Sequence, residues 1–89
     1  MPRIVFTANL RRHVDCPELE VAGRTVAEVL ASAFAVVPQV RGYVLDEQGQ
    51  VRKHVAIYVD GRRLIDRIRL SDDVTATSEV WVLQALSGG

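Results

Sequence analysis

The 89-residue chain contains very little cysteine, and its charge has no dominant sign. Cys16 is its single cysteine, so neither an internal disulfide nor a cysteine-ligated zinc site or cluster can form. Eleven basic and eleven acidic side chains cancel, and the basic ones are spread along the chain. Because nucleic-acid binders carry a concentrated basic surface, we do not expect a nucleic-acid partner.

Long apolar runs are also missing. No stretch approaches the roughly 18 consecutive apolar residues of a membrane span, and the apolar run in residues 1–7 is too short for a signal peptide. We therefore expect a cytoplasmic protein that makes no membrane contact. With 48% apolar residues, the chain has enough hydrophobic material for one compact domain and no length for a second.

A recognisable catalytic constellation is absent from the sequence as well. The two histidines, His13 and His54, lie in separate segments, and no Ser/His/Asp, paired-carboxylate or metal-ligand spacing is visible. The lone Cys16 lies in a strand-like stretch with nothing to activate its thiol, so we assign it no role. We expect no autonomous enzyme, no bound cofactor and no metal.

The clearest local signal is a helix start at Thr25. The segment Thr25-Val26-Ala27-Glu28 is a capping box, in which the Thr25 hydroxyl accepts from the Glu28 amide and the Glu28 carboxylate accepts from the Thr25 amide. Apolar residues then recur at steps of three and four, which predicts one amphipathic helix that ends at Pro38. The stripe consists of Val26, Val29, Leu30, Ala33, Phe34 and Val37.

Segments in which core-facing apolar residues occupy every second position predict strands before and after this helix. Asp60-Gly61 has the composition of a tight hairpin turn. The polar segment Asp46 to Gln50 indicates a surface loop. The predicted strands are Ile4 to Thr7, Cys16 to Val21, Tyr43 to Leu45, Val55 to Val59, Arg62 to Ile65 and Glu79 to Leu86.

This order of elements is typical of an α+β roll of the β-grasp type, in which a mixed sheet packs on one main helix. We expect residues 1–84 to form the domain and residues 85–89 to form a flexible tail that ends in Gly-Gly. The periodicities predict a core that includes Val26, Val29, Leu30, Phe34, Ile57, Val80 and Val82.

The tail, Ser87-Gly88-Gly89, is the most suggestive chemical feature. Glycines have no side chain, so Gly88 and Gly89 can thread through a narrow channel that a Cβ would block. Extended at about 3.3 Å per residue, residues 85–89 would reach on the order of 17 Å. A carboxylate on Gly89 is a poor electrophile until a partner activates it, for example by adenylation. Alone, however, two glycines are equally consistent with a frayed end.

The chain resembles the ThiS/MoaD family of ubiquitin-like sulfur carriers over essentially its whole length, and within that family the MoaD-type and cysteine-synthesis carriers. Each stretch that carries the resemblance is loose by itself, but their order and spacing are fairly specific. They are Ile4-Val5-Phe6 with Leu10-Arg11, Thr25-Val26-Ala27-Glu28-Val29-Leu30, Pro38 with Val44-Leu45-Asp46, His54-Val55-Ala56-Ile57-Tyr58-Val59-Asp60-Gly61, and Glu79-Val80-Trp81-Val82-Leu83 leading to Gly88-Gly89.

The resemblance implies that a partner of the ubiquitin-activating-like class uses ATP and magnesium to adenylate the Gly89 carboxylate. It further implies conversion to a thiocarboxylate that gives its sulfur to a downstream synthase. The chain departs from the family pattern at three positions: the family often has Asn where Asp60 stands, Asp where Ser78 stands and Pro where Gln84 stands. The acceptor is left open among thiamin, molybdopterin, cysteine, a thionucleoside and a secondary metabolite.

The last strand offers a docking surface. Trp81, Leu83 and Ala85 share one face of it, and an exposed apolar patch there would suit an activating enzyme, although a strand buried on both faces has the same pattern. The dispersed arginines between Arg62 and Arg69 alternate with acidic residues and are typical of a solvated surface.

Two other functions use the same sequence features. In the first, the chain is a ubiquitin-like modifier that is conjugated through Gly89 to lysines of other proteins. Lys53 is its single lysine, so extensive self-conjugation is not expected. In the second, the chain is a noncovalent β-grasp adaptor, and removal of Gly89 changes nothing.

Overall fold

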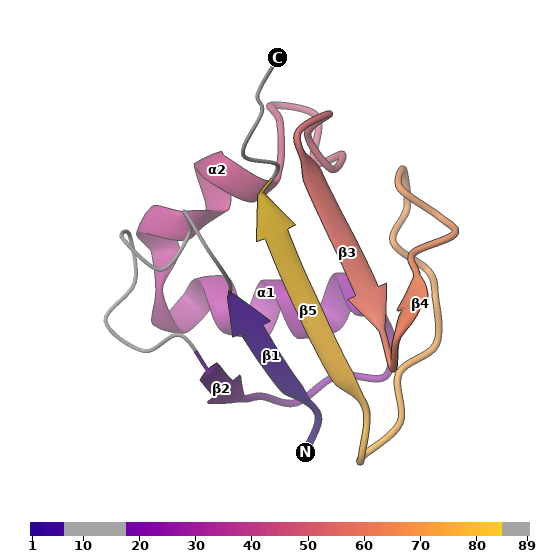
Figure 1. The fold of residues 1–89 in the computed structure, drawn as a ribbon. Coiled ribbons are helices and arrows are strands. Elements are labelled where there is room, and N and C mark those ends of the chain that lie inside the picture. The colour runs from indigo at the N-terminus through magenta and orange to yellow at the C-terminus, as the bar shows by residue number, and fades with distance from the viewer. Residues whose placement is uncertain (7–17, 85–89) are drawn as a thin grey trace.

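The computed structural model describes residues 1–6 and 18–84. Within these ranges one mixed sheet has the strand order β2-β1-β5-β3-β4. The strands are β1 (Arg3–Phe6), β2 (Glu18–Glu20), β3 (Val55–Val59), β4 (Arg62–Arg63) and β5 (Glu79–Gln84). The helix α1 (Val26–Val36) crosses behind this sheet in Figure 1. The predicted α+β roll, a mixed sheet packed on one main helix, is confirmed.

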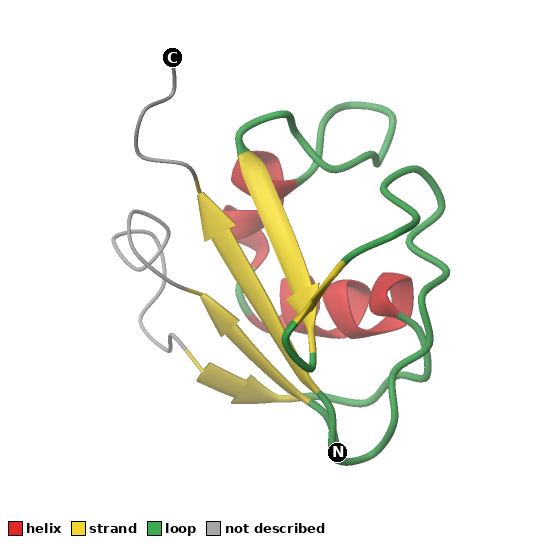
Figure 2. Ribbon diagram, turned by 45° about the vertical axis from the view of Figure 1, so that its right-hand side comes forward, coloured by secondary structure: helices red, strands yellow, loops and turns green. Residues whose placement is uncertain are grey.

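The first and last strands lie side by side at the centre of the sheet, as Figures 1 and 2 show. β1 runs parallel to β5 and antiparallel to β2. On its other side β5 pairs antiparallel with β3, which forms a hairpin with β4. β5 is thus the central strand, with two strands on each side.

The core lies between the sheet and the helices. Alternate residues of β1, β3 and β5 point toward α1, and those of β3 follow a strict alternation of buried and half-buried side chains. The seven residues predicted for the core are all buried, with at most 8% of any of them exposed. They are Val26, Val29, Leu30, Phe34, Ile57, Val80 and Val82.

Helix α1 begins as the capping box predicts, with one difference. The Thr25 hydroxyl accepts from the Glu28 amide at 3.3 Å, and Thr25 has the extended backbone of an N-cap. The Glu28 carboxylate accepts from the Arg24 amide at 2.9 Å and not from that of Thr25. The Glu28 side chain therefore caps the amide of Arg24, which lies one residue before the amide that a simple capping box predicts.

The prediction of a strand from Tyr43 to Leu45 is wrong. After α1 the chain forms the single 3₁₀ turn η2 (Pro38–Val40) and then the short helix α2 (Arg41–Val44). Val37, Val40 and Val44 are buried at steps of three and four, which is the helical period. Leu45 alone of this segment makes a β-bridge, and its partner is Val51 beyond the polar loop.

The hairpin after β3 forms as predicted but its second strand is short. Asp60 and Gly61 have φ angles of 51° and 82°, the left-handed pair that a type I′ turn requires. Strand β4 stops at Arg63, where Arg62 to Ile65 was predicted. The Ile65 amide donates to the Asp72 carboxylate at 2.9 Å, and this contact takes the chain away from the sheet.

Candidate partner-docking surface

The open face of the sheet carries a row of side chains whose order follows from the strand register. Trp81 of β5 lies opposite Val5 of β1 on one side and Tyr58 of β3 on the other. Tyr58 in turn lies opposite Arg63 of β4, and Leu83 lies opposite Ala56. This face points away from α1, which packs on the other side of the sheet (Figure 1).

Trp81 is the exposed apolar member of this row. It is 38% exposed, whereas Tyr58 and Leu83 are half-buried and Val5 is buried. Tyr58, Gly61, Glu79, Trp81 and Leu83 line a shallow hollow of about 360 Å³. We call this set of residues the sheet-face patch. Its aromatic floor with a polar rim is the anatomy of a protein-binding site.

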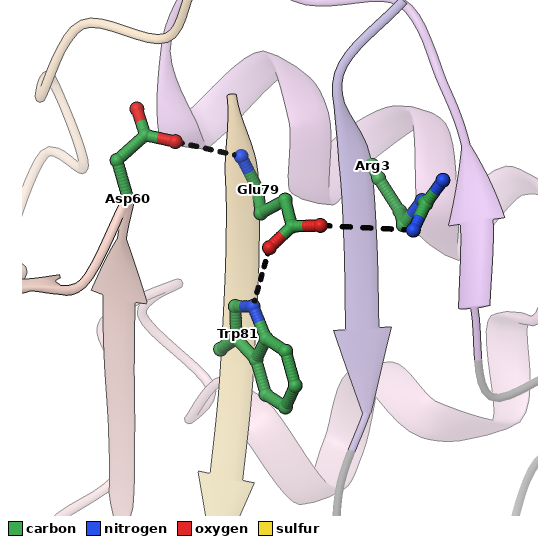
Figure 3. A network of polar contacts seen from close by, with 4 residues as sticks. All are labelled: Arg3, Asp60, Glu79 and Trp81. Atoms are coloured by element: carbon green, nitrogen blue, oxygen red, sulfur yellow. Dashed lines mark hydrogen bonds and ion pairs between the residues drawn. The ribbon is translucent and has the colours of Figure 1, made fainter. Parts of the chain in front are cut away.

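A chain of polar contacts holds the indole of Trp81 in place, as Figure 3 shows. The indole Nε1 donates to Glu79 Oε1 at 3.3 Å, and Glu79 Oε2 forms an ion pair with Arg3 Nη1 at 3.6 Å. Because both charged side chains are about half exposed, the ion pair itself adds little stability. Its effect is to orient the tryptophan.

Asp60 joins the hairpin turn to the start of β5. Its carboxylate accepts the Glu79 amide at 2.9 Å and the buried Ser78 hydroxyl at 2.8 Å. These two bonds, that of the Glu79 amide first, lower the pKa of Asp60 below its ordinary value of 3.8. The turn therefore stays tied to β5 throughout the neutral range.

The structure thus places two of the predicted docking residues, Trp81 and Leu83, together on the open face. The third, Ala85, and the tail residues Ser87, Gly88 and Gly89 lie outside the described residues, so their assignment stays a prediction. β5 ends at Gln84, so Leu83 of the sheet-face patch lies one residue before the end of the strand, whereas Glu79 lies at its start.

Sequence reasoning missed Tyr58, Glu79 and Arg3 as parts of this surface. Tyr58 could have been found, because it alternates with the buried Ile57 and Val59 and so faces outward. Arg3 could not, because its contact depends on β1 and β5 being neighbours.

Residues 1–6 and 18–84 contain no group of three His, Cys, Asp or Glu side chains placed to hold a metal ion. Over the same ranges no helix is long and apolar enough to cross a membrane.

No model of a known protein family matches the chain, and no curated protein sequence matches it significantly. Solved structures do share its fold. A chain of the Amycolatopsis orientalis BexX/CysO complex aligns with a TM-score of 0.86 and 18% identity over 100% of both chains. CysO of Mycobacterium tuberculosis aligns with a TM-score of 0.83 and 19% identity over 97% of this chain and 100% of that one.

SAMP1 of Haloferax volcanii aligns over 99% of this chain and 98% of that one, with a TM-score of 0.81 and 20% identity. At such identities the likeness establishes the fold. The chain has the β-grasp fold of the small ubiquitin-like proteins. The resemblance inferred from the sequence is therefore confirmed at the level of the fold.

Proposed function

We propose that the chain is a sulfur carrier of a biosynthetic pathway and acts as the substrate of a partner enzyme. The Gly89 carboxylate attacks the α-phosphate of ATP, held with magnesium by an activating enzyme, and pyrophosphate leaves. Hydrosulfide from the sulfur source then attacks the acyl carbon of this adenylate and displaces AMP, and loss of the proton on sulfur leaves a thiocarboxylate. The partner must exclude water, because water would hydrolyse the adenylate.

One observation carries this proposal. The central strand β5 presents Trp81 and Leu83 on the open face of the sheet and leads directly to the Gly88-Gly89 tail. An enzyme docked on the sheet-face patch therefore has the tail within reach, because five extended residues span on the order of 17 Å. The shared fold and the sequence resemblance support the same assignment.

The test is a sulfur-transfer reaction followed by intact-mass spectrometry. With an adenylating enzyme of the ubiquitin-activating-like class, ATP, magnesium and a sulfur source, the Gly89 carboxylate should gain the mass difference between sulfur and oxygen. Gly88→Leu should block the reaction, because the added side chain obstructs entry of the tail into the adenylation channel.

Cys16→Ser is the matched control for the chain's own thiol. It should leave the reaction intact, because the acyl group and not this thiol receives the sulfur. Sulfur found on Cys16 would contradict the proposal. A tail that stays unmodified with every adenylating enzyme of the class would contradict it as well.

A second candidate function is protein modification. Several structural neighbours are named as small archaeal modifier protein 1, and the activated tail that accepts sulfur can equally acylate a lysine. Conjugates linked through Gly89 to lysines of other proteins, recovered by mass spectrometry, would favour this function. Full biological activity of a chain lacking Gly89 would instead favour a noncovalent adaptor.

A further inference from the structure

A second hollow is lined by residues of α1, the helix that lies behind the sheet in Figure 1. One wall is a face of α1, and the other is formed by the loop after β4 together with Leu45 beyond α2. Its volume is about 270 Å³, and we call it the helix groove. Its apolar lining includes Ala27, Leu30, Ala31, Phe34, Ile68 and Leu70.

The groove is hollow because α1 carries alanine at two positions of the lining face. Ala27 and Ala31 stand four residues apart, one helical turn, beside the larger Leu30 and Phe34. Leu30 and Phe34 are buried, whereas Ala31 is exposed. The alanines therefore leave open space above an apolar floor.

Hydrogen bonds fix the opposite wall. The Ala27 amide donates to the Leu70 carbonyl at 2.9 Å, which ties the loop to the first turn of α1. The Asp66 carboxylate accepts the Ser71 hydroxyl at 2.6 Å and the Arg69 amide at 2.8 Å. These bonds, the hydroxyl first, lower the pKa of Asp66 to about 2, so its carboxylate keeps these bonds at mildly acidic as well as neutral pH.

Ile68 is displayed on this fixed loop with 65% of its surface exposed. An apolar side chain that is exposed on a hydrogen-bonded loop loses little further conformational entropy when a partner covers it. The rim of the groove is thus preorganised for apolar contact.

The charges that line the groove have one sign. Arg41 and Arg69 are its charged lining residues, and no Asp or Glu is among them. Both arginines are exposed, and neither has an ion-pair partner within the described ranges. Of the five acidic side chains in the adjoining loops, Asp46, Asp66 and Asp72 accept hydrogen bonds from backbone amides of their own loops. The other two, Glu47 and Asp73, are exposed and lie outside the lining. An apolar floor whose lining also carries two guanidinium groups complements a segment that combines apolar side chains with carboxylates.

We propose that the helix groove docks a peptide segment of a partner protein in which aliphatic side chains alternate with carboxylates. Its volume is below the roughly 300–1,000 Å³ of small-molecule pockets, which favours one or two side chains over a nucleotide or cofactor. The groove and the sheet-face patch lie on opposite sides of the sheet. One chain can therefore hold such a segment while its sheet face is occupied, whatever the chemistry at Gly89.

The probe is an acetylated and amidated hexapeptide of alternating leucine and glutamate, titrated into the ¹⁵N-labelled chain. The amide signals of Ala31, Ile68 and Arg69 should shift, while that of Trp81 should not. A glutamine-for-glutamate peptide and a serine-for-leucine peptide should each bind at least several-fold more weakly, because the first lacks the charge and the second the apolar contact.

Two variants with matched controls test the groove itself. Ala31→Glu places a carboxylate in the hollow and should abolish the shifts, whereas Ala31→Gln fills the same space without charge and should weaken binding less. Arg69→Glu should weaken binding by at least about two- to fivefold, which is the change in affinity that one exposed charge pair contributes. Lys53→Glu makes the same charge change outside the groove and should have little effect.

Three results would overturn the proposal. The first is no shift at Ile68 up to the solubility limit of the peptide. The second is equal binding of the glutamate and glutamine peptides, which would show that charge complementarity does not contribute to the affinity. The third is a set of signal shifts centred on Trp81, which would show that the peptide binds the sheet-face patch.

Discussion

Asp60 and Ser78 form one hydrogen-bonded pair between the hairpin turn and the start of β5. This chain has a carboxylate at position 60 and a hydroxyl donor at position 78. The Ser78 hydroxyl oxygen also accepts from the Thr75 amide at 2.9 Å, although Ser78 is only 2% exposed. The two positions therefore act as one pair, with Ser78 as the donor and Asp60 as the acceptor.

Replacing Asp60 with asparagine should lower the free energy of unfolding by on the order of 1 kcal/mol at neutral pH, because the bonds to Ser78 and Glu79 lose their charge assistance and solvent screens part of the effect. The folded pKa of Asp60 is below 3.8, so this contribution is complete above about pH 4 and is lost as the pH falls through the folded pKa. Denaturant unfolding at several pH values should show the two proteins converging on acidification. A constant difference across the acid range would contradict the assignment.

The double variant Asp60→Asn, Ser78→Asp should recover part of the lost stability. A carboxylate introduced at position 78 can accept from the Thr75 amide and from the side-chain amide introduced at position 60. Ser78→Asp alone should be the least stable of the set, since it brings two carboxylates together at a buried position. Additive effects in this double-mutant cycle would show that the two positions are independent.

Under the proposed function, Trp81 is the aromatic anchor of the sheet-face patch. Trp81→Ala should weaken binding to the activating enzyme roughly tenfold or more while the domain remains folded, because buried aromatic anchors carry much of an interface's energy. Isothermal titration calorimetry gives the affinity. Ile65→Ala is the matched control, since Ile65 is 87% exposed and lies outside the sheet-face patch. Equal affinities for both variants would remove Trp81 from the site.

At the scale of elements, the sequence predicts those whose signals are local. A capping box and a long apolar stripe specify α1, and alternation with an Asp-Gly turn specifies β3 and its hairpin. Tyr43 to Leu45 is different, because three consecutive apolar residues fit a strand or a buried helical turn equally well. α2 spans four residues and has too little intrinsic stability to form alone, so packing of Val40 and Val44 in the core decides its conformation.

The cap of α1 can be tested directly. Thr25→Ala should cost roughly 1 kcal/mol, because the Glu28 amide loses its acceptor at the helix N-terminus. For a domain of this size the melting temperature should fall by about 4–8 °C. Thr25→Ser keeps the hydroxyl and should fall much less. If both variants melt alike, the hydroxyl is not the cap.

At the scale of the whole molecule, the docking surface was only partly predictable. Trp81 and Leu83 follow from alternation within one strand. The contact of Glu79 with Arg3 and the pairing of Trp81 with Tyr58 depend on strand order, which no local pattern encodes. Residues distant in sequence meet there because β5 lies between β1 and β3.

The placement of β5 also governs when the domain can fold. Until the final strand has left the ribosome, β1 and β3 have no strand between them and both present unpaired backbone groups, which favour association with other chains. The central pairing closes a loop of nearly the whole chain, and such distant contacts slow folding relative to helical domains of equal size. Folding of this sheet therefore requires residues 3–84 to be available together, and nascent chains stalled before Glu79 should be the aggregation-prone species.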